Sequence, residues 1–285
     1  MRKKIVLSCQ LMLPYDALVD LGKRFNLTFA SSCHMTEAEV LKEFKDAQGI
    51  IIGGEEIITK NVAESISPQW IIFLGIQPET SFEEYGWKKF HNIIYKTGGG
   101  ENTVAKTTVD QVENHLQNGN EEQSITVVGT GNIGQKVLKE LHERHPYVYY
   151  SGGRGEKESL KSGYKFLDLR EAFSFSGVIT LHLKLVPNVT EKLIKLDHLA
   201  SMPTNALLIN NARAQIVDFA ALETMLHLRP DIRVIFDTYY PDRVSDELGC
   251  YKNFTFTRHS AASSEETRTE YGRNLLRIIR EIELI

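Results

Sequence analysis

Short runs of apolar residues alternate with longer amphipathic stretches along most of the chain. The runs are rich in Ile, Val and Leu, which is typical of buried strands in a parallel sheet, and the stretches between them are typical of helices that cover such a sheet. In the first part of the chain the pattern predicts strands at residues 5–7, 27–29, 49–54, 70–74 and 93–95. It predicts helices at 15–25, from Thr36 onward and at 58–66.

A second series of strands and helices begins at Ser124, after a helix predicted over residues 101–117. Its strands are expected at 125–128, 147–150, 178–183, 206–209, 234–236 and 254–257. The last segment, 265–284, is amphipathic because its apolar residues recur at helical spacing on one face. We therefore expect an α/β protein with two doubly wound parallel sheets, and a C-terminal helix that packs back on the first of them.

Composition narrows the classes of protein that this chain can represent. Its 285 residues are enough for two domains, and 42% hydrophobic with 25% charged residues is typical of a soluble globular protein. A net charge of −4 provides no basic surface for nucleic acid, and no apolar run reaches membrane-spanning length. Three widely spaced cysteines indicate reduced thiols in a cytoplasmic protein, without a disulfide framework or a metal site. Residues 1–13 resemble a signal peptide, but Ser8 and Gln10 interrupt the apolar part, which favours a first strand.

The segment from Ser124 to Gly134 carries the most specific chemical signal, a β-branched strand that leads directly into G-x-G-x-x-G. In this pattern Gly129 allows the tight turn, Gly131 lets the backbone approach a pyrophosphate, and Gly134 lets the following helix pack on the strand. The N–H groups of the first helical turn, which includes Asn132 and Ile133, then face the anion. Because the strand and the helix that the motif requires are both predicted, we interpret it as a dinucleotide site.

The choice between NAD and NADP depends on the end of the second strand, where an NAD site places an acidic residue. Here the sequence reads Ser151, Gly152, Gly153, Arg154, with no carboxylate. A 2′-phosphate would meet no repulsion there, and it would find a guanidinium and a hydroxyl as partners. The residues favour NADP(H) over NAD(H), although a surface turn with a solvated arginine would give the same pattern.

Three ordered motifs downstream of the glycine loop resemble those of the D-isomer-specific 2-hydroxyacid dehydrogenases, in a diverged form similar to glyoxylate and hydroxypyruvate reductases. They are ITLHLKLVPNVTEKLI at 179–194, ALLINNARAQIVD at 206–218, and VIFDTYYPD at 234–242, followed by TRHSA at 257–261. The resemblance implies a Rossmann-type dinucleotide-binding domain over 105–262 and a flavodoxin-like substrate domain over 1–104 and 263–285.

The resemblance also implies roles for individual residues. Arg213 would orient a 2-oxo acid, and His259 would donate the proton with help from Asp242, which stands where the family usually has Glu. Gly75 and Ile76 would hold the substrate together with Arg213 and His259. The further cofactor-binding positions that it implies are Leu183, Asn211, Ala212 and Asp237.

The chain departs from the family pattern at several places. Gln77 replaces the second glycine of the substrate loop, Lys106 replaces an acid, and Lys184 replaces a proline. The segment between Ala105 and Gly129 is shorter than in the family, where an arm wraps a partner subunit. We therefore expect a monomer or an atypical homodimer.

Two interpretations of function follow from the sequence. The first is an NADP(H)-preferring oxidoreductase that reduces a small-molecule 2-oxo acid, such as glyoxylate, hydroxypyruvate or a bulkier acid, to a D-2-hydroxy acid. The alternative is a catalytically impaired dinucleotide-binding sensor or partner-binding protein of the same fold. The altered substrate loop, Lys106 and Asp242 motivate the alternative, whereas Arg213 and His259 argue for the enzyme because a pure binder needs neither.

Overall fold

The computed structural model describes residues 2–8, 13–30, 35–53, 57–75, 78–118, 123–152, 163–238, 247–257, 260–261 and 264–284. The chain divides into two compact units, one formed by Met1–Gly100 with Ser263–Ile285 and the other by Glu101–Ala262. Both units are α/β and each contains one parallel sheet, which confirms the predicted fold class. The boundary expected after residue 104 falls within helix α5 (Glu101–Gln117), which belongs as a whole to the second unit.

The first unit contains a five-stranded sheet in the order β2-β1-β3-β4-β5. Its strands are β1 (Lys4–Leu7), β2 (Asn26–Phe29), β3 (Gly49–Ile52), β4 (Trp70–Phe73) and β5 (Ile94–Lys96). This is the flavodoxin-like strand order, in which the direction of winding reverses between β1 and β3. The central strands β1, β3 and β4 are almost entirely buried because helices cover both faces of the sheet.

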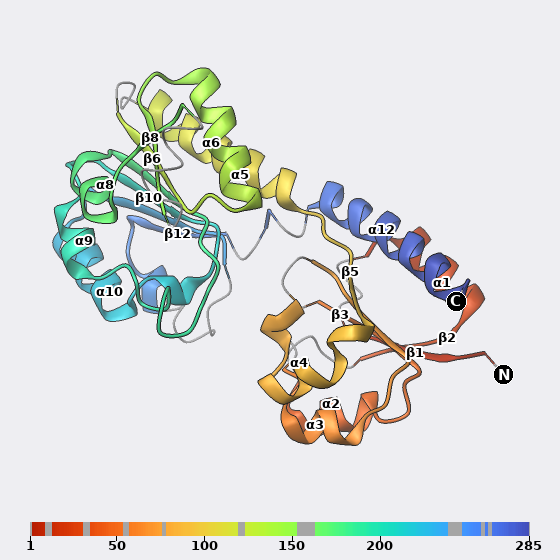
Figure 1. Cartoon of the computed structure of the whole chain (residues 1–285). Helices are drawn as coiled ribbons and strands as arrows, with labels where there is room; N and C mark the ends of the chain where they lie inside the picture. The colour runs from red at the N-terminus through yellow and green to blue at the C-terminus, as the bar shows by residue number, and fades with distance from the viewer. Residues whose placement is uncertain are drawn as a thin grey trace. The chain divides into compact units, whose positions relative to one another are not determined.

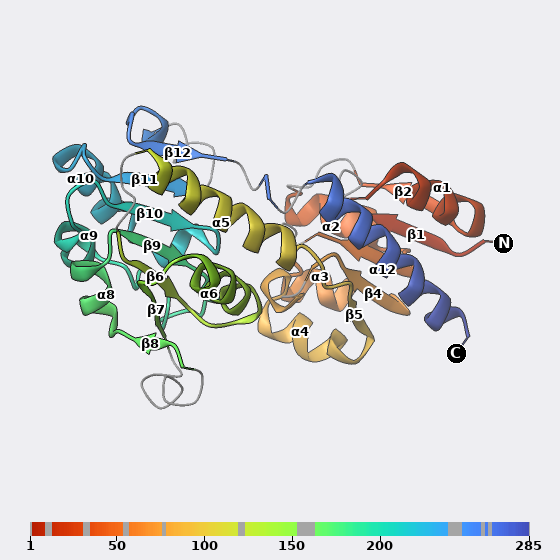
Figure 2. The ribbon, with the colours of Figure 1, turned by 90° about the horizontal axis from the view of Figure 1, so that it is seen from above.

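In the described part of this unit, five helices cover the faces of the sheet. They are α1 (Tyr15–Arg24), α2 (Glu37–Phe44), α3 (Lys60–Ser65), α4 (Glu84–Phe90) and α12 (Glu265–Glu283), with short 3₁₀ turns at Pro78–Ser81 and His91–Ile93. Leu21 of α1 and Leu275 of α12 share one core with Ile5 and Ile72, whereas α2, α3 and α4 contribute to the core on the other face. Figures 1 and 2 both show α12 beside α1, so the C-terminal helix packs on the first unit as its amphipathic pattern predicts.

The second unit contains a seven-stranded sheet in the order β12-β11-β10-β9-β6-β7-β8. Its strands are β6 (Ile125–Val128), β7 (Val148–Ser151), β8 (Lys165–Phe166), β9 (Val178–Leu181), β10 (Leu207–Asn210), β11 (Arg233–Phe236) and β12 (Phe254–Phe256). This is the order of a Rossmann-type sheet extended by one strand, with its switch point between β6 and β9.

Two layers of helices cover this second sheet. Helices α5 and α6 (Asn132–Arg144) lie over one face, and α8 (Leu169–Phe175), α9 (Leu196–Ser201) and α10 (Phe219–Leu228) lie over the other, with a 3₁₀ turn at Ala214–Ile216. The helix predicted over 101–117 is confirmed at both ends. Among the described residues, no helix is both long enough and apolar enough to span a membrane.

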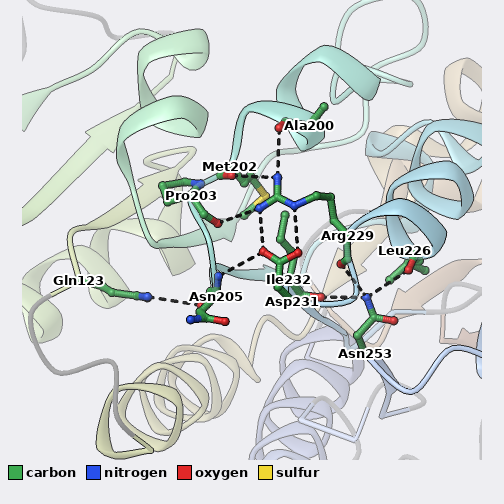
Figure 3. Close-up of polar contacts among 10 residues, drawn as sticks. All are labelled: Gln123, Ala200, Met202, Pro203, Asn205, Leu226, Arg229, Asp231, Ile232 and Asn253. Atoms are coloured by element: carbon green, nitrogen blue, oxygen red, sulfur yellow. Dashed lines mark hydrogen bonds and ion pairs between the residues drawn. The ribbon is translucent and has the colours of Figure 1, made fainter.

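Arg229, Asp231 and Asn253 form a network of hydrogen bonds at the amino ends of β10 and β11, which we call the polar clasp (Figure 3). The guanidinium of Arg229 donates to both carboxylate oxygens of Asp231, at 2.9 and 2.8 Å, and also to the carbonyl oxygens of Ala200, Met202 and Pro203. The amide of Asn253 donates to three further carbonyl oxygens, those of Leu226, Arg229 and Ile232. These contacts close the edge of the sheet opposite to the one at which open α/β sheets bind ligands.

Candidate dinucleotide and reductase site

The residues that the sequence singles out in the second unit leave the sheet at a single edge. Strand β6 runs into Gly129, β7 ends at Ser151, β10 runs into Asn211 and β11 runs into Asp237. Because all of these strands are parallel, their carboxyl ends share that edge. In open α/β sheets the carboxyl edge at the switch point is where ligands bind.

The glycine loop has the conformation and the packing that its motif requires. Gly129 has a φ of +96°, and a Cβ built on it would lie 2.8 Å from the carbonyl carbon and oxygen of His182. A Cβ on Gly134 would lie 1.9 Å from the carbonyl oxygen of Gly129. Neither position has room for a side chain, so Gly129 and Gly134 are required for the fold itself.

Gly131 differs from its two neighbours because a Cβ built on it would meet no protein atom within 4 Å. It is the N-cap of α6, whose first turn contains Asn132 and Ile133 and no acidic residue. The first N–H groups of a helix have no intrahelical acceptor, so they are available to an anion. Open space at Gly131 together with these donors fits a pyrophosphate group.

The end of β7 lies next to this loop. The N–H of Gly129 donates to the carbonyl oxygen of Ser151 at 2.8 Å. Gly152 has a φ of +147°, and its built Cβ would lie 3.5 Å from the N and Cα of Gly129. Ser151 is buried, and no carboxylate follows it before the described segment ends at Gly152. Gly153 and Arg154 lie outside the described residues.

Arg213 lies in a short turn that two neighbouring asparagines, Asn210 and Asn211, hold in place. The Asn210 side chain donates to the carbonyl oxygen of Arg213 at 2.9 Å and accepts from the N–H of Ala212 at 3.1 Å. Arg213 itself is half-buried and donates to the carbonyl oxygen of Ala212 at 2.9 Å. Asn211 donates to the Thr108 hydroxyl at 2.8 Å and to Gln111 at 3.0 Å, which ties the turn to α5.

Asp237 is buried and its contacts are with the loop that follows β12. Its carboxylate accepts from the N–H groups of Ser260, at 2.7 Å, and Ala261, at 3.1 Å. It also accepts from the hydroxyl groups of Ser260, at 3.2 Å, and Thr257. Asp242 and His259, which the sequence assigns to proton transfer, lie outside the described residues.

His182 is a residue of this edge that the sequence did not assign to the site. Although the residue as a whole is half-buried, both of its ring nitrogens are buried and have no hydrogen-bond partner among the residues that the structure describes. Burial lowers the pKa of His182 to about 4 because the imidazolium would lose its hydration there. Leu183, predicted to contact the cofactor, has its Cδ2 3.0 Å from the Cβ built on Gly129, so it lies against the glycine loop.

In the first unit, Gly75 follows β4 and has a φ of +140°. Its N–H donates to the Thr97 hydroxyl at 3.0 Å, and its carbonyl oxygen accepts from the N–H of Gly98 at 2.9 Å. Both backbone groups of Gly75 are therefore engaged within this unit. Ile76 and Gln77 lie outside the described residues.

No metal-binding cluster occurs in the part of the chain that the structure describes, which leaves the expected absence of a metal untested in the rest of the chain. Cys250 is exposed and forms no disulfide with a described residue, whereas Cys9 and Cys33 fall outside the described ranges.

The chain is similar to several known proteins. The D-3-phosphoglycerate dehydrogenase of Methanocaldococcus jannaschii is 24% identical over 84% of this chain and 50% of its own length. The glyoxylate reductase of Aeropyrum pernix is 26% identical over 51% of this chain and 44% of its own length. The chain thus spans about half the length of these curated relatives.

Solved structures share the fold over the whole chain. A phosphoglycerate oxidoreductase from Vibrio cholerae o395 aligns over 100% of both chains with a TM-score of 0.78 and 16% identity. An acyclic imino acid reductase in complex with NADPH and D-arginine aligns over 99% of this chain and 97% of its own, with a TM-score of 0.74 and 20% identity. The 3-phosphoglycerate dehydrogenase of Entamoeba histolytica, solved with NAD⁺, aligns over 98% and 94%, with a TM-score of 0.75 and 18% identity.

The glycine loop, the Arg213 turn and the Asp237 loop all fall within residues 92–261, which match a family model described as "D-isomer specific 2-hydroxyacid dehydrogenase, NAD binding domain". A nicotinamide dinucleotide is therefore the class of cofactor that this unit serves. Since the match covers more than half of its residues, the chain belongs to the D-isomer-specific 2-hydroxyacid dehydrogenase family.

Proposed function

We propose that this protein reduces a 2-oxo acid to a D-2-hydroxy acid, with NADP(H) preferred over NAD(H). The observation that carries the proposal is that Gly129, Asn211 and Asp237 follow parallel strands of one sheet and therefore share its carboxyl edge. A pure dinucleotide binder would need the glycine loop, but it would not need an arginine at the same edge of the sheet, where the Asn210 side chain holds the backbone carbonyl of Arg213.

Each side chain has a chemical task in this proposal. The glycine loop would hold the pyrophosphate of the dinucleotide, and the reduced nicotinamide of the same cofactor would supply a hydride to the carbonyl carbon of the acid. Arg213 orients the acid, because its planar fork of donors matches a carboxylate and an adjacent carbonyl oxygen. His259 donates the proton that the carbonyl oxygen needs as negative charge builds on it. Asp242 favours the imidazolium form of His259 and orients its ring.

The first unit would bind the substrate. We propose that the segment at Gly75 and Ile76 holds the substrate carboxylate. The N–H of Gly75 is engaged by Thr97, so Gly75 would act by fixing the shape of the segment, and the contact with the carboxylate would fall to the residues after it.

The activity is tested by following NADPH oxidation with a panel of 2-oxo acids that includes glyoxylate, hydroxypyruvate and bulkier homologues. His259→Asn should lower kcat by roughly 10²- to 10⁴-fold while NADPH affinity is retained. Arg213→Lys keeps the charge but loses the fork, so it should raise KM for the acid and lower kcat. Exchange of the exposed Arg170 for lysine is the matched control and should change neither constant.

The same assay separates the enzyme from a sensor of the same fold. If the wild-type protein binds NADPH but turns over no 2-oxo acid, the reductase proposal fails and the sensor interpretation stands. The altered residues Gln77, Lys106 and Asp242 would then be the first positions to revert to the family pattern.

The proposed preference for NADP(H) depends on the residues at the end of β7. Neither Ser151 nor Gly152, which follows it, carries a carboxylate. We propose that Ser151 and Arg154 bind the 2′-phosphate of NADP(H). Arg154→Ala should then raise the Kd of NADPH much more than that of NADH, whereas Arg170→Ala should affect neither. Equal loss of affinity for both cofactors would discard the assignment.

Oligomeric state forms a separate part of the proposal. Helix α5 ends at Gln117 and β6 begins at Ile125, so the chain has little room for an arm in this connection. We propose a monomer or a homodimer with an atypical interface. Sedimentation velocity tests this proposal, and a tight dimer that is crosslinked through residues 105–129 would contradict it.

A further inference from the structure

Two polar residues on the face of the second sheet that α5 and α6 cover have buried atoms to which no described residue is hydrogen-bonded. These atoms are both ring nitrogens of His182 and the amide oxygen Oδ1 of Asn211. Asn211 as a whole is 6% exposed. A buried polar atom without a partner loses its hydration and gains nothing in return, so three of them on two residues require a physical explanation.

His182 and Asn211 are neighbours in the sheet. Leu181 at the end of β9 pairs with Asn210 at the end of β10, so the next residue of each strand stands at the same level. The Cβ of His182 lies 3.3 Å from a Cβ built on Gly134 of α6, and Asn211 is hydrogen-bonded to α5, so both side chains are on one face. Because paired strands lie about 4.8 Å apart, the two side chains are within reach of one hydrogen bond or one bridging water molecule.

The donors and acceptors of the two side chains match. The Thr108 hydroxyl donates its one proton to the carbonyl oxygen of Val104 at 2.8 Å, so it accepts from Nδ2 of Asn211. With Nδ2 facing α5, Oδ1 of Asn211 is left as an acceptor. Burial lowers the pKa of His182 to about 4, so at neutral pH its uncharged ring carries the one N–H donor that Oδ1 requires.

Each of the two residues is joined to a different part of the proposed site. The carbonyl group of His182 lies against the glycine loop, with both of its atoms 2.8 Å from a Cβ built on Gly129. Asn211 stands two residues before Arg213, in the turn that carries the arginine. The glycine loop and the Arg213 turn are therefore connected through His182 and Asn211.

We infer that His182 and Asn211 form a buried pair, joined directly or through one water molecule, that positions Arg213 relative to the glycine loop. This inference rests on the proposed function, because it takes Arg213 to be the residue that orients the 2-oxo acid. Hydride transfer requires a fixed distance between cofactor and acid, and a displacement of about 1 Å can cost roughly 100-fold in rate. Both residues act through Arg213, so they are positioning residues and not catalytic ones.

A double-mutant cycle in kcat tests whether the two residues act as a unit. His182→Leu and Asn211→Val should each lower kcat about tenfold, and the double variant should lose little more than either single variant. Residues that act independently would together lose about 100-fold. The Kd of NADPH should stay within about twofold in all three variants, since none of them changes the glycine loop. His227→Leu, at an exposed histidine of α10, is the matched control and should leave kcat unchanged.

Two further variants separate hydrogen bonding from simple filling of space. The side-chain amides of His182→Asn and His182→Gln place an N–H group about where Nδ1 and Nε2 of the ring lie. The variant that matches the donating nitrogen should retain most of the wild-type kcat, whereas leucine fills the space without a donor. If both amide variants lose as much kcat as His182→Leu, the hydrogen-bonding role is wrong.

Nitrogen NMR of the histidine rings in the whole chain gives a readout that does not depend on turnover. The His182 signals are identified by their loss in His182→Leu. Near pH 7 they should report an uncharged ring with one slowly exchanging N–H proton, and Asn211→Val should shift them whereas His227→Leu should not.

Ring signals that Asn211→Val leaves unchanged would overturn the inference, as would kcat losses that multiply in the double variant. A wild-type protein without turnover would refute the proposed function and with it the positioning of Arg213. The NMR signals would still decide in that case whether His182 and Asn211 form a pair.

Discussion

The backbone N–H of Gly75 donates to the hydroxyl of Thr97 at 3.0 Å, and this bond joins the segment after β4 to the end of β5. The bond is buried, and a second one from the N–H of Gly98 to the carbonyl oxygen of Gly75 completes the link. Asn274 of α12 in turn donates to the carbonyl oxygen of Thr97. Thr97, which directly precedes the three glycines before α5, thus holds the proposed substrate segment at Gly75 in place.

Thr97→Val should test this link, because it removes the hydroxyl while keeping the shape of the side chain. The N–H of Gly75 would lose its acceptor in a buried place, at a cost of about 1–3 kcal/mol in the free energy of unfolding. We expect the KM for the 2-oxo acid to rise while the Kd of NADPH stays unchanged. Thr97→Ser retains the hydroxyl and should behave as wild type, and an equal effect of both variants would contradict the link.

Gly131 and Gly134 should respond in opposite ways to the same substitution. A Cβ at Gly131 meets no protein atom, and its φ of −72° suits any residue, so Gly131→Ala should fold with an unchanged Tm. Its methyl group would occupy the space into which a pyrophosphate must come, and the Kd of NADPH should rise at least tenfold, about 1.4 kcal/mol. Cofactor affinity equal to wild type would show that this space is not the binding site.

Gly134→Ala is the counterpart, because its Cβ would lie 1.9 Å from the carbonyl oxygen of Gly129. The strand and helix would have to separate, and we expect a clear loss of Tm in the free protein. Thermal melts of both variants without cofactor, beside titrations with NADPH, separate an effect on the fold from an effect on the site.

Much of the fold was predictable from the sequence because its signals are local. The helix over 101–117 is confirmed to the residue, since Gly98-Gly99-Gly100 precedes it and Asn118-Gly119 follows it. The three glycines have φ values of +62°, +97° and +79°, which few other residues adopt.

Errors arose where neighbouring strands decide the outcome. The strand predicted over 178–183 ends at Leu181, because Leu181 pairs with the last residues of β6 and β10 and the chain leaves the ladder there. Strand β8 was missed because its two residues, Lys165 and Phe166, are too few to show a period.

The sequence predicted which residues form the candidate site, but it did not predict the hydrogen bonds that hold them. Motif resemblance singled out Arg213 and Asp237 by residue type and order. The hydrogen bonds that hold them come from Asn210, Ser260 and Ala261, and for Asp237 these partners lie more than twenty residues away. No spacing rule in a single sequence identifies such partners. His182 was left unassigned because burial of its ring nitrogens is a property of the fold.

Arg229 and Asp231 should contribute stability through geometry more than through charge. Arg229→Lys keeps the positive charge but cannot donate to both oxygens of Asp231 and to the carbonyl oxygens around it. We expect a loss of about 1–2 kcal/mol in the free energy of unfolding, measured by urea denaturation at neutral pH. Lys252→Arg, a surface change of similar chemistry, should have no effect.

The pH dependence of this clasp follows from Asp231. Hydrogen bonds from Arg229 lower the pKa of Asp231 below its ordinary value of 3.8. A lowered carboxyl pKa contributes stability that is present above pH 3.8 and is lost as pH falls through the lower value of the folded state. The difference between wild type and Asp231→Asn should therefore be constant from pH 5 to 8 and should shrink only in stronger acid.

Protonation of His182 should lower the free energy of unfolding of the second unit at a higher pH than protonation of Asp231 does. Its pKa in the folded protein is about 4, against an ordinary value of 6.5, because burial of both ring nitrogens disfavours the imidazolium. The unfolded chain then binds a proton between pH 6.5 and 4 that the folded chain does not bind. Stability must therefore fall as pH is lowered through this window, by roughly 3 kcal/mol in total.

Replacement of His182 by leucine removes the titrating group, so the variant should lose less stability than wild type between pH 7 and pH 4. Both tryptophans, Trp70 and Trp87, lie in the first unit, so their fluorescence follows that unit, whereas far-UV circular dichroism follows both. In urea unfolding, His182→Leu should change the transition that circular dichroism records. It should leave unchanged the transition that tryptophan fluorescence records, because that signal comes from the first unit. His227→Leu, at an exposed histidine of α10, is the control and should keep the wild-type pH dependence. If wild type and His182→Leu lose the same stability between pH 7 and pH 4, His182 is not held neutral in the folded protein.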